Sequence, residues 1–115
     1  MLRVKVANSF AALTDDHVEH CISVTAANTG RAAATVTGWG IRLPNGTDYI
    51  VVRPPVFSAQ TPARIEPHAS ATFRMGADEL RQHAWQAVVA FKDMRPFIRT
   101  AADKCIFAKR PVPLK

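Results

Sequence analysis

Two histidines, a glutamate and a cysteine fall within five residues in the first fifth of the chain. The segment is His17-Val-Glu-His20-Cys21, and imidazole, carboxylate and thiolate groups are the ligands that zinc prefers in proteins. On an extended strand, however, His17 and His20 point to opposite faces, and the pair does not complete a set of four ligands. We therefore favour partly exposed histidines at the entry to a strand, and we expect no metal site.

The sequence lacks the arrangements that nucleophilic and nucleotide-dependent enzymes use. It contains neither a Gly-x-Ser-x-Gly elbow nor a Gly-x-x-x-x-Gly-Lys phosphate loop. Gly38-Trp-Gly40 lacks the third glycine and the following helix of a dinucleotide-binding loop. We predict a protein without enzymatic activity and without a cofactor, although a sandwich fold can carry a site that its sequence does not display.

Positive charge gathers toward the C-terminal end. The chain has 15 basic and nine acidic residues, and residues 92–115 alone have seven basic and two acidic ones. Such a surface favours nucleic acid, an anionic surface or an acidic protein as partner, and an ordinary solvated surface is the alternative. Phe97 shares strand parity with two of the arginines, which would allow it to stack on bases. The candidate nucleic-acid-binding residues are Arg95, Arg99, Lys104, Lys109 and Arg110.

Three aromatic residues are candidates for contacts with a partner protein, namely Tyr49, Phe57 and Trp85. Phe57 follows Pro54-Pro-Val in an apolar loop, with Tyr49 close by in sequence. An exposed aromatic residue in such a loop is typical of a binding contact, while a loop folded over the core is the alternative. For Trp85 we favour burial in the core over an exposed anchor.

These candidates lie in a chain whose dominant hydrophobic period is two, which is typical of half-buried strands. Strands are expected over residues 2–7, 18–27, 33–43, 47–53, 63–67, 70–75, 96–101 and 105–109, with a polar loop over 8–17. Val36 and Trp39 lie on opposite parities of one strand, so we place a β-bulge beside Gly38, with Trp39 in the core. Pro44-Asn-Gly46 predicts a hairpin turn.

One segment has a helical period instead. Leu80, Ala84, Ala87 or Val88, and Phe91 recur at helical spacing, and two acidic residues at the start suit the helix dipole. We predict a helix near residues 78–90, with a strand over 85–91 as the alternative. The pattern as a whole predicts an all-β fold, a two-sheet antiparallel immunoglobulin-like sandwich of seven or eight strands. It would occupy residues 1–110, followed by a flexible tail over 111–115.

Two segments resemble a set of uncharacterised bacterial proteins. The first runs from Ile22 through Asn28-Thr-Gly30 to Gly38-Trp-Gly-Ile-Arg-Leu-Pro-Asn-Gly46, and the second is Arg64-Ile-Glu-Pro-His68-Ala-Ser70. The family has glycine where this chain has His68. The resemblance covers about residues 2–110 and implies an immunoglobulin-like sandwich rather than an activity. Such domains often follow an anchoring or coiled segment in longer bacterial proteins.

Two cysteines, Cys21 and Cys105, lie in apolar strands, and no signal-like or membrane-spanning apolar run is visible. We expect a cytoplasmic protein with buried thiols, and the sequence leaves open whether the two cysteines meet. The predicted function is a non-catalytic protein-interaction or structural module of bacterial or phage origin, with a homo-oligomer through a sheet edge as one form. The alternative is nucleic-acid or anionic-surface binding through the basic C-terminal hairpin.

Overall fold

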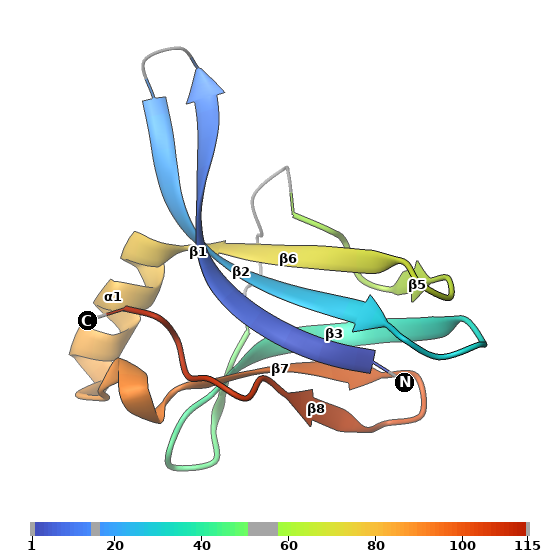
Figure 1. Ribbon diagram of the computed structural model, residues 1–115. Helices are drawn as coiled ribbons and strands as arrows, with labels where there is room; N and C mark the ends of the chain where they lie inside the picture. Colours follow the sequence, from blue (N-terminus) through green and yellow to red (C-terminus); the bar gives the residue numbers. More distant parts are fainter. Residues whose placement is uncertain (1, 15–16, 51–57, 115) are drawn as a thin grey trace.

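Two antiparallel sheets form the protein, as the computed structural model shows (Figure 1). The structure describes residues 2–14, 17–50 and 58–114, and the side chains of all of these except residues 11–14, 17 and 19. Sheet A consists, in order, of β1 (Leu2–Thr14), β2 (His17–Asn28) and β6 (Ser70–Gly76). Sheet B consists, in order, of β4 (Asp48–Tyr49), β3 (Ala34–Arg42), β7 (Arg95–Thr100) and β8 (Cys105–Phe107), and β5 (Ala63–Ile65) also pairs with β3. The predicted all-β, two-sheet antiparallel class is confirmed.

The inner faces of the two sheets enclose one apolar core. Its central aromatic contact is the stacked pair of Trp39 from β3 and Phe73 from β6, with ring centroids 5.6 Å apart. Val36 and Trp39 are both buried because the pairing of β3 with β7 shifts register between Val36 and Gly38. The predicted bulge and the predicted burial of Trp39 are confirmed, and the sandwich provides a rigid frame for the surfaces described below.

Strands β1 and β2 continue as a two-stranded arm where the sequence predicts a polar loop. They pair from Leu2 opposite Asn28 to Thr14 opposite His17, whereas β6 accompanies β2 only as far as Cys21. Figure 1 shows the arm leaving the body of the sandwich. The prediction of a loop over residues 8–17 is therefore wrong for residues 8–14 and 17, and residues 15 and 16 lie outside the described part of the chain. An arm without a covered face has no reason to alternate apolar and polar residues, so the usual strand signal is missing.

Tight turns follow the sequence prediction more closely. In the β3–β4 hairpin, the Gly46 N–H donates to the Leu43 carbonyl (3.0 Å) and the Leu43 N–H to the Thr47 carbonyl (2.8 Å). Gly46 has a φ of 87°, which explains the glycine, and the predicted hairpin is confirmed. His68 also has a positive φ of 66°, a backbone conformation that favours glycine. Residues 51–57, including Pro54 and Phe57, lie outside the described part of the chain.

The helix α1 (Ala77–Ala87) packs Ala77, Leu80 and Ala84 against the sheets. It ends earlier than predicted because Val88 adopts a left-handed conformation, with φ 56° and ψ 48°. The Val89 N–H then donates to the Ala84 carbonyl (3.0 Å), which is a Schellman ending, and Val89 instead of Val88 packs on the core. A strand over residues 85–91 is wrong, since the 3-10 helix η1 (Phe91–Asp93) follows.

Residues 111–114, part of the predicted flexible tail, are attached to the sandwich. Val112 is only 2% exposed, and its N–H donates to the Met94 carbonyl (3.1 Å). The Pro113 carbonyl accepts a hydrogen bond from Asn8 Nδ2 (3.0 Å), and Leu114 packs against the core. The prediction is wrong for these residues because two apolar side chains near the end of the chain cover an open side of the core.

Candidate interaction site

Two large apolar side chains stand exposed at the end of α1. Trp85, on the last turn of the helix, is 82% exposed, and Val88, directly after the helix, is 90% exposed. Both lie off the buried stripe that Leu80 and Ala84 form. The interpretation of Trp85 as a core residue is therefore wrong.

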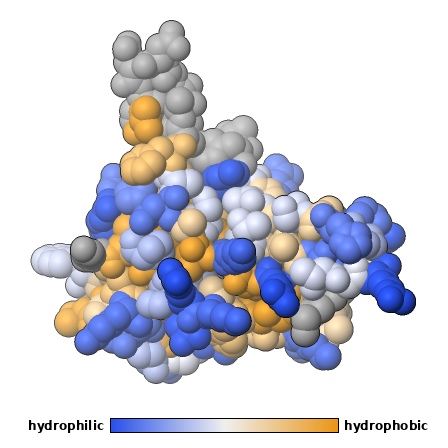
Figure 2. All heavy atoms as spheres, in the orientation of Figure 1, coloured by the Kyte–Doolittle hydropathy of each residue, from blue (hydrophilic) through white to orange (hydrophobic). Residues whose placement is uncertain are grey.

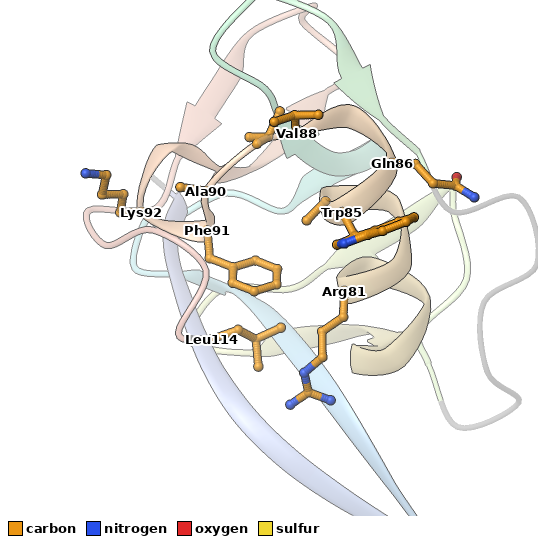
Figure 3. A pocket seen from close by; sticks show the side chains of 10 residues that line it. Arg81, Trp85, Gln86, Val88, Ala90, Phe91, Lys92 and Leu114 are labelled. Carbon is orange, nitrogen blue, oxygen red and sulfur yellow. The ribbon is translucent and has the colours of Figure 1, made fainter.

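These two side chains border a shallow hollow that α1, the turn after it and the C-terminal segment form together (Figure 3). Phe91 and Leu114 line the hollow beside Trp85. We call these four residues the α1 patch, and they are Trp85, Val88, Phe91 and Leu114. Two cationic residues, Arg81 and Lys92, stand at its border. The result is an apolar surface with positive charge at its rim.

The backbone at Val88 is strained. A left-handed conformation costs an L-residue about 1–2 kcal/mol, and a β-branched side chain makes it an outlier. Glycine is the usual residue at this position of a Schellman ending. Since the Val88 side chain is almost fully exposed, it does not repay the strain by packing in the core. Strained residues of this kind are concentrated at functional positions.

Arg81 is fixed in place by contacts on both sides. Its Nη1 forms an ion pair with Asp78 (2.7 Å), one turn earlier on α1. Its Nη2 lies 3.2 Å from His20 Nδ1 at the base of the arm, and His20 Nε2 lies 2.9 Å from Asn8 Oδ1. The edge of the α1 patch is thus tied to β1 and β2.

Of the other predicted partner-binding aromatics, Tyr49 lies at a different place and Phe57 lies outside the described residues. Tyr49 is half-buried against His83 of α1, with ring centroids 4.4 Å apart. Burial raises the pKa of Tyr49, and the nearby Glu79 carboxylate raises that pKa further. Within the described part of the chain, His83 Nε2 is buried without a hydrogen-bond partner. Tyr49 therefore joins β4 to the helix and does not line the hollow beside Trp85.

All five predicted nucleic-acid-binding residues are exposed. They are Arg95, Arg99, Lys104, Lys109 and Arg110. Phe97, between the first two, is only 2% exposed because the Phe107 ring (centroids 5.9 Å apart) and the Arg42 guanidinium (5.3 Å from its centroid) cover it. The expectation that Phe97 stacks on bases is therefore wrong, and Phe107 is the aromatic residue that reaches the surface here.

Arg42, which the sequence analysis missed, completes this outer face of sheet B. Asp48 binds its guanidinium in two places, at Nε (2.8 Å) and Nη2 (3.2 Å). The Arg42 guanidinium holds the pKa of Asp48 below its usual value, and the carboxylate raises the pKa of Arg42. A Cβ at Gly40 would come within 2.6 Å of the Tyr49 carbonyl oxygen, so only glycine leaves room beside this face. Arg42 lies on the same face of the strand as Gly40, and the buried Trp39 lies on the opposite face. Alternation along the strand was therefore the sequence signal that could have placed Arg42 on the outer face.

An open groove separates the free edges of the two sheets. β1 is an outer strand of sheet A and β8 an outer strand of sheet B. Between them lies a cavity of about 680 Å³, lined by residues 2–6 and 106–110. We call it the β1–β8 groove. Its exposed cationic residues are Arg3, Lys5, Lys109 and Arg110.

Among the described residues, no group of three or more histidine, cysteine or acidic side chains is arranged to hold a metal ion. The side chains of His17 and Glu19 fall outside that description. Cys21 is buried in sheet A, Cys105 is half-buried in sheet B, and they form no disulfide with each other. In the described ranges, no helix has both the length and the apolar character needed to cross a membrane.

Comparison with known proteins gives one structural likeness. No family model matches the chain, and no curated protein matches it. Among solved structures, the chain is similar to an X-ray structure titled Northeast Structural Genomics Consortium target SoR45. The two are 18% identical over 93% of this chain and 80% of that one, with a TM-score of 0.41. A likeness at this level carries no argument about function.

Proposed function

We propose that this chain is a non-catalytic protein-interaction module that binds a partner protein through the α1 patch. The observation that carries the proposal is the exposure of Trp85 beside Val88. Contiguous exposed apolar surface marks interaction sites on proteins, and tryptophan is enriched among the residues that dominate binding energy. The partner would present an apolar surface to the hollow and acidic side chains to Lys92.

The strain at Val88 supports the same proposal. A glycine there would relieve the backbone and cost no core packing, so stability alone favours glycine. A valine is favoured where its exposed methyl groups contact something outside the chain. The proposal therefore accounts for a residue that the isolated sandwich does not explain.

We propose that the frame of this module is an immunoglobulin-like sandwich. In such domains, strands A, B and E form one sheet and strands C, F and G the other. Here β1, β2 and β6 occupy one sheet and β3, β7 and β8 the other, in the corresponding chain order, which supports the assignment. A cytoplasmic location belongs to the same proposal.

Site-specific photo-crosslinking in native lysate tests the α1 patch. A benzophenone amino acid replaces Gln86, which is exposed and lines the hollow, and in a control chain it replaces Ala32, exposed in the turn between β2 and β3. The lysate is treated with nuclease and kept at high salt. We expect one discrete protein adduct from position 86 and none from position 32.

The contribution of the indole is measured with paired variants of the crosslinking chain. Trp85→Ala should reduce the adduct at least tenfold, because truncating a central aromatic anchor costs about 2 kcal/mol or more. Gln82→Ala, also exposed on α1, should leave the yield unchanged. Equal yields from positions 86 and 32, or an adduct that is insensitive to Trp85→Ala, would contradict the proposal.

A second candidate function is nucleic-acid binding through the basic hairpin of β7 and β8, supported by the joint exposure of its five cationic residues. Binding to a fluorescent single-stranded oligonucleotide is measured over a range of salt concentrations. Combining Arg95→Ala with Arg99→Ala should weaken binding and flatten the log–log salt dependence by about 1.4, since each phosphate contact contributes about 0.7. An affinity independent of salt would exclude this function.

A further inference from the structure

We propose that the β1–β8 groove binds an extended acidic segment of a partner protein, which adds to a free sheet edge as an extra strand. The two edges face each other, and the space between them is open and basic. The inference concerns a surface separate from the α1 patch, so either proposal can fail without the other.

The first argument is the pairing of the backbone. Within the described residues, β1 pairs only with β2, and β8 only with β7. The Ala108 N–H donates to the Pro96 carbonyl (2.9 Å), toward β7. In an antiparallel pair, successive residues direct their N–H and C=O groups to alternate sides, so those of Phe107 point away from β7 and toward the groove. An unpaired edge of this kind is a template for strand addition.

The second argument is the shape and lining of the groove. Its apolar residues are Leu2 and Val4, both buried on the inner face of β1, and the half-buried Val6 and Ile106. The wall that β1 provides is five residues long, or about 16 Å at the usual rise of a strand, whereas the opposite wall consists of the last two residues of β8 and the three residues that follow it. The groove is open to solvent along its length and has a volume of about 680 Å³. A strand of about five residues fits this length, with every second side chain directed inward.

The third argument is charge, and it selects the occupant. Arg3, Lys5, Lys109 and Arg110 are exposed, form no ion pair with a described residue, and have no acidic neighbour within residues 2–6 or 106–110. Figure 2 shows this face, where strongly hydrophilic side chains stand beside apolar surface. A second copy of the chain would bring the same four positive charges against these. A nucleic acid would use the charges and leave the apolar residues and the backbone edge without partners.

The alternation along β1 defines the chemistry of the segment. Arg3 and Lys5 face outward, while Leu2, Val4 and Val6 face the core. Side chains directly opposite each other on paired strands contact one another, and opposite charges there are stabilising. The occupant that fits is therefore a strand in which acidic and aliphatic residues alternate.

A blocked seven-residue peptide in which glutamate and valine alternate is the probe, with fluorescence anisotropy of a terminal label as the readout. We expect saturable binding to the full chain. Combining Lys5→Glu with Lys109→Glu should weaken binding at least tenfold. Lys92→Glu, a matched reversal at the α1 patch, should change the affinity less than about twofold. Because all three lysines are exposed, these variants should keep their fold.

Modified peptides test backbone pairing on the unaltered protein. One peptide is N-methylated at its valines and the other at its glutamates. Because only alternate N–H groups face the adjoining strand, one of the two should bind at least tenfold more weakly than the parent, and the other should bind nearly as well. A lysine–valine peptide should not bind.

Four outcomes would overturn the proposal. The first is the absence of binding by the glutamate–valine peptide, and the second is unchanged binding by both methylated peptides, which would leave charge alone as the cause. The third is competition by an oligothymidine of equal affinity that also requires Lys5 and Lys109, which would indicate a nucleic-acid site. The fourth is a dimer in sedimentation that the Lys5→Glu and Lys109→Glu pair abolishes, which would assign the groove to a second copy.

Discussion

The two tryptophans of this protein occupy opposite environments. Trp39 is 7% exposed, whereas Trp85 is 82% exposed. Trp39 lies on a central strand, where a side chain has only two directions, and the bulge turns it toward Phe73. Trp85 lies on a helix that only one stripe of residues attaches to the sheets, and it falls outside that stripe. The same residue type is therefore part of the core in one place and part of the exposed surface in the other.

The stability cost of truncation is the strongest test of this contrast. Trp39→Ala should lower the free energy of unfolding by about 3–5 kcal/mol, because it removes buried area and leaves a cavity beside Phe73. Trp85→Ala should change that free energy by no more than about 0.5 kcal/mol, as is usual for exposed positions. Chemical denaturation measures both values. Equal losses would show that the indole of Trp85 packs within the fold.

A glycine at the end of α1 separates stability from binding. Val88→Gly should raise the free energy of unfolding by about 1 kcal/mol, since glycine adopts the left-handed conformation without strain. The same variant should reduce the crosslink from position 86, because two exposed methyl groups are lost from the α1 patch. Gln82→Gly, at an exposed position inside the helix, should instead lower stability by about 1 kcal/mol. A destabilised Val88→Gly chain would contradict the strain argument.

Fluorescence of single-tryptophan variants compares the two sites directly. In Trp85→Phe, the remaining Trp39 should emit at shorter wavelength and resist quenching by acrylamide, because the sandwich excludes water from it. In Trp39→Phe, the remaining Trp85 should emit at longer wavelength and be quenched readily. Binding of the partner protein should shield Trp85 alone. Quenching of similar strength in the two variants would remove the basis of the comparison.

The smallest expected effect concerns Tyr49, which joins β4 to the helix that carries Trp85. As the only tyrosine in the chain, it can be titrated by its phenolate absorbance. Its pKa should lie above 10.0, the ordinary value, and Glu79→Gln should lower it only partly, because burial is the larger cause. The remote substitution Glu66→Gln should leave it unchanged.

The raised pKa of Tyr49 also fixes the direction of a pH effect on stability. Folding disfavours the phenolate form of Tyr49. The contribution of Tyr49 to the free energy of unfolding is therefore fully present below the ordinary pKa of 10.0, and it is lost as pH rises through the pKa of the folded state. The unfolding free energy should therefore fall more steeply above pH 10 in the parent chain than in Tyr49→Phe. Parallel curves would show that the phenol ionises alike in the folded and unfolded chains.

Local sequence patterns predicted the structure correctly where a residue and its neighbours in the chain determine the backbone conformation. Pro44-Asn-Gly46 predicted its turn because few residues tolerate the positive φ of Gly46. The parity change from Val36 to Trp39 predicted the bulge because each strand face admits only one parity. For the same reason, alternation located β6 and the core residue Phe73.

Local sequence patterns gave wrong predictions where contacts with distant segments of the chain determine the structure. Among the described residues, no third strand pairs with the arm of β1 and β2 beyond Cys21, and its sequence lacks alternation, so a loop was predicted for residues that form strands. Val112 and Leu114 looked like part of a frayed end, yet an open side of the core receives them. Trp85 lies off the buried stripe of α1, and the residues around it in the sequence do not determine whether a distant segment covers that side of the helix.

The positions of the turns and of the bulge therefore follow from residues close together in the chain, since backbone sterics and side-chain period act over a few positions. The α1 patch and the β1–β8 groove do not. Each is built from segments far apart in sequence: residues 85–91 meet Leu114 in the patch, and residues 2–6 meet residues 106–110 in the groove. Burial and edge pairing are properties of the packed sandwich, because they depend on which surfaces its other parts leave uncovered.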